Sequence, residues 1–99
     1  MPDSLRETLE TILVVDDHEM VRKVVVDILE QANFHVLTAD GGASAVRVAQ
    51  ETSRVIDLLL SDVEMPGMSG PDLGEVLKKA RPDMHVMLMS GGVDSDTIS

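Results

Sequence analysis

The sequence predicts an α/β fold in which a parallel β-sheet carries helices on both faces. Short β-branched runs alternate with segments whose apolar residues recur at helical spacing, in the order β-α-β-α-β-α-β. The first run, residues 11–15, is apolar on both faces, which is typical of a strand covered by helices on both sides. Such alternation implies right-handed crossovers between parallel strands.

Spacing and turn residues place the first elements. After the strand at 11–15, one helical face is predicted by residues at i, i+3, i+4, i+7 and i+11, namely Val21, Val24, Val25, Ile28 and Ala32. Asn33 permits a turn into a second strand at 34–39. Asp40-Gly41-Gly42 then breaks the chain before a short second helix that includes Ala45, Val46 and Ala49.

The second half repeats this alternation. A buried third strand is predicted at 55–61, followed by a loop at 62–70 with Pro66, Gly67 and Gly70. Pro71 suits the first turn of a third helix, and Pro82 ends that helix because the residue before a proline is pushed out of the helical region. A fourth strand is predicted at 85–89, and residues 94–99 could start a fourth helix.

Size and charge limit the class of protein. Ninety-nine residues form one small domain, so we expect a single domain over 1–99 with a flexible N-terminus at 1–10. Acidic residues outnumber basic ones 18 to 8, and the net charge of −10 argues against nucleic acid or a membrane surface as a partner. The absence of cysteine excludes disulfides and thiolate sites. Without a signal peptide or a membrane-spanning run, a soluble cytoplasmic protein is expected.

Oxygen-bearing side chains stand where three of the strands end. Asp16-Asp17 follow the first strand, Ser61-Asp62 end the third, and Ser90 follows the fourth. In open parallel sheets, ligands bind beyond the carboxyl ends of the strands. If the first and third strands are neighbours, about 4.8 Å apart, the three carboxylates converge, and they cannot all stay ionised without a proton or a cation. Mg²⁺, or Mn²⁺, is the natural cation for such oxygen ligands.

Each of these residues alone has a simpler explanation. An acid pair after a strand is more often a solvated turn or a helix cap, and Asp62 beside a Pro/Gly loop could serve turn formation. Ser90 before Gly91-Gly92 could be only a turn. His18 could be a metal ligand, but we favour an exposed residue at a helix start. The metal site is therefore predicted from the joint placement of these residues at one edge of the sheet.

Three segments resemble the receiver domain of two-component response regulators. They are ILVVDD at 12–17, DLLLSDVEMPGMSG at 57–70 and MLMSG at 87–91. The resemblance implies a doubly wound parallel sheet of the flavodoxin-like receiver fold, with three α/β/α layers and the strand order 2-1-3-4-5. The Ser-Gly after the fourth strand is similar to receivers appended to hybrid histidine kinases.

The resemblance also implies a role for each site residue. Asp62 corresponds to the phospho-acceptor, which takes a phosphoryl group from a sensor histidine kinase or a phosphotransfer protein. Asp17 and Asp62 would ligate Mg²⁺ directly, Asp16 through water and Glu64 through its backbone carbonyl. Ser90 corresponds to the switch hydroxyl. The implied function is phosphorelay signal transduction by a phosphoprotein, not a turnover enzyme.

The sequence departs from the family pattern at its C-terminal end. Receivers continue through a fifth strand, which ends in a phosphate-binding lysine, and a fifth helix, so the 99 residues correspond to a C-terminally truncated receiver. The lysines here, Lys23, Lys78 and Lys79, lie on the expected first and third helices. An alternative function is therefore a phosphorylation-silent interaction module.

Two further expectations follow. The exposed edge of the strand at 85–89 predicts a homodimer, since an open edge is a template for pairing with another chain. A phosphatase with an aspartate nucleophile is a third candidate, but that class uses Asp-x-Asp after the first strand and a larger chain, whereas this chain has Asp16-Asp17-His18.

Overall fold

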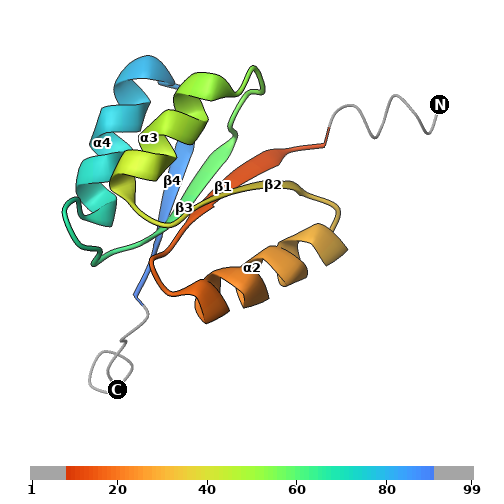
Figure 1. The fold of residues 1–99 in the computed structure, drawn as a ribbon. Helices are drawn as coiled ribbons and strands as arrows, with labels where there is room; N and C mark the ends of the chain where they lie inside the picture. Colours follow the sequence, from red (N-terminus) through yellow and green to blue (C-terminus); the bar gives the residue numbers. More distant parts are fainter. Residues whose placement is uncertain (1–8, 91–99) are drawn as a thin grey trace, which may run out of the picture.

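The computed structural model describes residues 9–90, which form one parallel sheet and three helices (Figure 1). The strands lie in the order β2-β1-β3-β4, and all neighbouring pairs are parallel. The elements are β1 Thr11–Val15, α2 Glu19–Gln31, β2 His35–Ala39, α3 Gly42–Glu51, β3 Leu58–Asp62, α4 Gly70–Ala80 and β4 His85–Met89. The predicted α/β class, element order and doubly wound sheet are confirmed.

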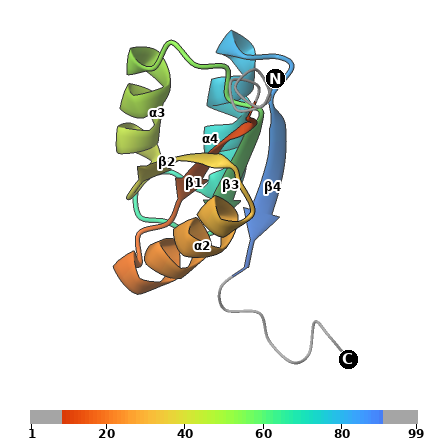
Figure 2. The ribbon, with the colours of Figure 1, turned by 90° about the vertical axis from the view of Figure 1, so that its right-hand side faces the viewer.

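The helices make three layers with the sheet. α3 and α4 pack together on one face, where α3 contacts β1 and β2, and α4 contacts β3 and β4. α2 lies on the opposite face against β1 and β2 (Figure 2). Within residues 9–90, no helix covers the α2 side of β3 and β4. No helix in this part of the chain is long and apolar enough to cross a membrane.

The main core lies between the sheet and the pair α3/α4. Leu13 and Leu59 pair across β1 and β3, and both are fully buried. Leu73 of α4 packs into this core, as do Ile56, which precedes β3, and Met84, which precedes β4. Burying side chains of this size stabilises the fold by about 1.5–3 kcal/mol each. All of β1 is buried, as expected for a strand covered on both faces.

The apolar face predicted for α2 is wrong, because it is rotated by part of a helical turn from the face that packs on the sheet. Val21, Val24 and Ile28 are 44%, 56% and 61% exposed. The side chains turned toward the sheet are half-buried and are those of Arg22, Val25, Val26 and Leu29. Both sets have helical spacing, because three valines in succession satisfy two adjacent stripes. Periodicity alone could not choose between them.

The third strand begins at Leu58, three residues later than predicted. Asp57 ends the connection before it, because its carboxylate accepts a hydrogen bond from the Thr11 N–H (2.8 Å) and its own N–H donates to the Thr11 carbonyl (2.9 Å). Val55 is 71% exposed and outside the sheet. The second strand begins at His35, after Asn33 takes a positive φ of 72°, as its predicted turn role requires. The expected helix start at 94–99 lies outside the described residues.

The start of α4 fixes the backbone next to the end of β3. Ser69 caps the helix by accepting a hydrogen bond from the Asp72 N–H (3.2 Å), and Pro71 occupies the first turn, as predicted. Gly70 donates from its N–H to the Val63 carbonyl (2.8 Å). A Cβ at this glycine would overlap the carbonyl oxygen of Asp62. The glycine therefore lets the helix approach the last residue of β3.

This contact predicts different effects for two glycine substitutions in one helix. Gly70→Ala should destabilise the protein by about 1–3 kcal/mol, because the backbone of Asp62 must move. Gly74→Ala should be close to neutral, since its Cβ would meet only Val86 at 3.3 Å and alanine favours the helix by about 1 kcal/mol. Urea unfolding of both variants measures the difference. Equal losses of stability would contradict the close approach at Gly70.

Candidate functional site

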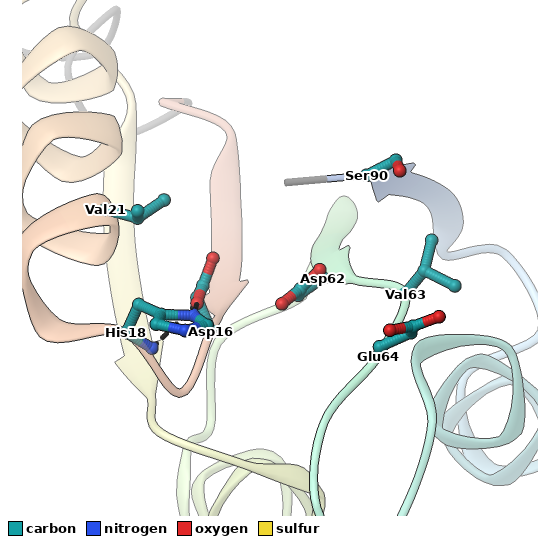
Figure 3. A pocket seen from close by; sticks show the side chains of 7 residues that line it. All are labelled: Asp16, His18, Val21, Asp62, Val63, Glu64 and Ser90. Carbon is teal, nitrogen blue, oxygen red and sulfur yellow. Dashed lines mark hydrogen bonds and ion pairs between the residues drawn. The ribbon is translucent and has the colours of Figure 1, made fainter. Parts of the chain in front are cut away.

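A pocket of about 430 Å³ opens at the carboxyl ends of β1, β3 and β4 (Figure 3). This is the edge of the sheet at which the sequence predicts a ligand site. The pocket is lined by Asp16, His18, Val21, Asp62, Val63, Glu64 and Ser90. Four of these seven residues were singled out from the sequence as functional, namely Asp16, Asp62, Glu64 and Ser90.

The register of the sheet brings the predicted carboxylates together. Val15 of β1 is aligned with Ser61 of β3, so that the next residues, Asp16 and Asp62, face one another across adjacent strands. Both are buried, with 3% and 7% of their surface exposed. One ligand atom from each of Asp16, Asp17, His18 and Asp62 lies within 4.8 Å of the others. The expected convergence of the three carboxylates is therefore present.

Asp16 is held in place by two neighbours. Its Oδ1 accepts a hydrogen bond from the backbone N–H of His18 (2.8 Å). The guanidinium of Arg22 donates to its carbonyl oxygen (2.7 Å) and so ties the first turn of α2 to the end of β1. Arg22 was missed by sequence reasoning, because the predicted apolar face of this helix did not include it.

His18 is both exposed and in contact with the carboxylates. It is the N-cap residue of α2, and its side chain is 70% exposed, as expected for a residue at a helix start. Its Nδ1 nevertheless lies 3.2 Å from Oδ1 of Asp16 and 3.3 Å from Oδ1 of Asp17. The ring therefore bridges the acid pair, which helix-start residues in general do not do.

Asp62 has few partners of its own. The hydroxyl of Ser61 donates to its carbonyl oxygen (2.9 Å), but no group within residues 9–90 donates a hydrogen bond to its carboxylate. Nor does any lysine or arginine in that range form an ion pair with Asp16, Asp17 or Asp62. The carboxylate of Asp62 faces the pocket beside two further carboxylates, so the pocket is strongly negative. This donor set fits a hard divalent cation such as Mg²⁺.

The remaining predicted residues lie at the rim. Glu64 and Ser90 are exposed, and Ser90 directly follows β4. Val63 donates from its N–H to the Met89 carbonyl (2.9 Å), which keeps the loop after β3 beside the end of β4. Val21 and Val63 form apolar walls of the pocket that sequence reasoning did not single out. Asp17, with its side chain 29% exposed, belongs to the carboxylate cluster without lining the pocket itself.

Comparisons with known proteins agree with this geometry. The response regulator receiver domain model matches residues 12–99. The chain is 36% identical over 83 residues to the response regulator receiver protein CpdR of Brucella abortus, covering 84% of this chain and 68% of CpdR. It is also 36% identical over 81 residues to the sensor kinase CckA of the same organism, covering 82% of this chain but only 9% of CckA.

Solved structures show the same fold. A receiver domain protein from Clostridium thermocellum superimposes with a TM-score of 0.79 at 34% identity, covering 90% of this chain and 71% of that one. A structure of the histidine kinase ThkA in complex with the response regulator protein TrrA matches with a TM-score of 0.74 at 29% identity, covering 87% and 72%. The sheet order, the acidic pocket at its carboxyl edge and these matches together show that the chain belongs to the response regulator receiver domain family of two-component signalling.

Proposed function

We propose that this chain accepts a phosphoryl group on Asp62 in a magnesium-dependent reaction and so acts in a two-component phosphorelay. The observation that carries the proposal is the position of Asp62, a largely buried residue whose carboxylate faces the pocket and receives no hydrogen bond within residues 9–90. It stands in an open pocket beside two further carboxylates. A carboxylate in this position is able to attack phosphorus and is accessible to a donor.

The reaction is a transfer between two covalent phosphoryl adducts. An Asp62 oxygen forms a bond to phosphorus while the bond from phosphorus to the donor imidazole breaks, and the imidazole nitrogen keeps the electron pair and takes up a proton. The carboxylate cluster would hold Mg²⁺, which would offset the negative charge during the transfer. Asp17 and Asp62 would hold it directly, Glu64 through its backbone carbonyl and Asp16 through water.

Other residues of the chain keep this arrangement in place. Asp16 is fixed by the His18 N–H and by Arg22, so its carboxylate stays on the pocket side of β1. Gly70 sets the backbone behind Asp62. Ser90 lies at the pocket rim, which supports the proposal that its hydroxyl meets a phosphoryl group on Asp62 and acts as the switch hydroxyl. A movement of Ser90 would alter protein contacts on the β4 side. In this proposal the chain acts as a signalling module and not as a turnover enzyme.

The donor that best fits this site is a histidine kinase or a phosphotransfer protein. The structure of ThkA with TrrA is one in which a protein with this fold is bound to a histidine kinase. The net charge of −10 disfavours nucleic acid and anionic lipid as partners. We propose a protein partner on these grounds.

The alternative, a phosphorylation-silent interaction module, has one specific observation in its favour. No lysine in residues 9–90 lines the pocket, since Lys23 lies on α2 and Lys78 and Lys79 lie in the last turn of α4. A phosphoryl group carries a charge of about −1.5 to −2 at pH 7, and a cation must offset it. Incubation with a small phosphodonor separates the two proposals.

Incubation with acetyl phosphate and Mg²⁺, followed by intact mass measurement, tests the phospho-acceptor. The wild-type chain should gain one phosphoryl group, and Asp62→Asn should gain none, because its amide oxygen is a poor nucleophile. Asp83→Asn is the matched control, since it removes an exposed carboxylate remote from the pocket and should leave labelling unchanged. Label that persists in Asp62→Asn would identify another acceptor. An unlabelled wild-type chain would favour the silent module.

We also propose that the 99-residue chain forms a homodimer through β4. This strand is the edge of the described sheet and has no charged Asp, Glu, Lys or Arg, so two copies can meet there despite the net charge. Met87 and Leu88 are 56% and 41% exposed on its two faces. A second copy fits best because the uncharged edge is complementary to itself about a twofold axis.

Sedimentation velocity at micromolar concentration tests the dimer. The wild-type chain should sediment as a dimer, and Met87→Lys should shift it to a monomer, because the substitution places a positive charge from each copy at the shared edge. Val55→Lys is the control, since Val55 is also an exposed apolar residue but lies at the other end of the sheet. A compact wild-type monomer that binds no apolar dye would refute the proposal.

A further inference from the structure

We propose that His18 is a nitrogen ligand of the pocket cation, so that this site prefers divalent transition metals to Mg²⁺. The proposal rests on the metal site of the proposed function and deepens it. It concerns the identity of the ion, which the carboxylates alone do not decide.

The imidazole is positioned by one carboxylate oxygen of Asp16. His18 is the N-cap of α2, and its backbone N–H donates to Oδ1 of Asp16 at 2.8 Å. The same Oδ1 lies 3.2 Å from Nδ1 of the ring. Backbone and side chain of one residue therefore contact the same carboxylate, and the ring nitrogen is directed at Asp16 (Figure 3).

The distances fit the edges of one coordination shell. An octahedral ion with metal–ligand bonds of about 2.1 Å sets neighbouring ligand atoms about 3 Å apart. Nδ1 of His18 lies 3.2 Å from Oδ1 of Asp16 and 3.3 Å from Oδ1 of Asp17. A cation bound by Nδ1 of His18 and Oδ1 of Asp17 would lie beside the carboxylate of Asp16, which would reach it through water.

The carboxylate of Asp62 would be a further oxygen ligand of a cation in this pocket. Asp62 is 7% exposed, faces the same pocket, and no group in residues 9–90 donates to its carboxylate. One of its oxygens lies within 4.8 Å of the atoms named above. Its carboxylate faces the open pocket beside the other carboxylates, and a cation there would offset their charges. The pocket thus supplies oxygen ligands from two strands and one nitrogen ligand from the start of α2.

A nitrogen ligand changes which ion binds best. Mg²⁺ prefers oxygen ligands and retains several waters, so an imidazole adds little to its binding. Affinity for mixed nitrogen and oxygen sites rises from Mn²⁺ to Ni²⁺, and imidazole suits Ni²⁺ and Zn²⁺ in particular. His18 should therefore strengthen Ni²⁺ binding while leaving Mg²⁺ binding almost unchanged.

Calorimetric titration with MgCl₂ and NiCl₂ tests this selectivity. His18→Gln should weaken Ni²⁺ binding at least about tenfold and leave Mg²⁺ binding within about twofold. His85→Gln is the matched control, because His85 opens β4 at the opposite end of the sheet and should change neither affinity. Equal weakening of both ions in His18→Gln would mean that His18 only supports the fold of the site, which would overturn the proposal.

A spectroscopic measurement on the unmodified chain keeps the test independent of how the variant folds. Mn²⁺ bound to the wild-type protein should show a nitrogen coupling in its pulsed electron paramagnetic resonance, and His18→Gln should lose it while His85→Gln retains it. Mn²⁺ binding without that coupling would overturn His18 as a ligand and leave the magnesium proposal standing. If neither Mg²⁺ nor Ni²⁺ binds, both proposals fail.

Discussion

The crowding of three carboxylates at the ends of two neighbouring parallel strands is the constraint on which this structure depends. Because β1 and β3 run side by side in the same direction, the residues that follow Val15 and Ser61 must share one edge of the sheet. Asp16 and Asp62 are nearly buried there, so water screens their charges poorly. A cation in this pocket would offset the charges of the three carboxylates, and we propose that signalling uses such a cation.

Backbone contacts hold this arrangement against the repulsion. At the pocket, Arg22 binds the main chain of Asp16, and the glycine at position 70 allows α4 to approach the main chain of Asp62. Asp57 joins the opposite ends of β1 and β3 through the Thr11 N–H. The strands are therefore fixed at both ends, and this keeps the backbones of Asp16 and Asp62 side by side.

Much of this could be predicted from the sequence, and the exceptions have physical reasons. The bounds of β1 and β4 were predicted correctly, because β-branched and apolar runs stand between clear turn residues. The inward face of α2 was not, since Val24, Val25 and Val26 satisfy two stripes at once. The adjacency of Asp16 and Asp62 could be predicted once the first and third strands were taken as neighbours. The contact of His18 with the acid pair did not, because it depends on the backbone conformation of one N-cap residue.

Thermal melting with and without millimolar Mg²⁺, in the wild-type chain and in Asp17→Asn, tests the central claim most directly. Mg²⁺ should raise the melting temperature of the wild-type chain by several degrees through mass action on the folded state. The rise should be much smaller in Asp17→Asn, which lacks one carboxylate of the cluster. Without metal, the variant should be at least as stable as the wild type, because one repulsive charge is gone. Equal rises in both proteins would contradict the account.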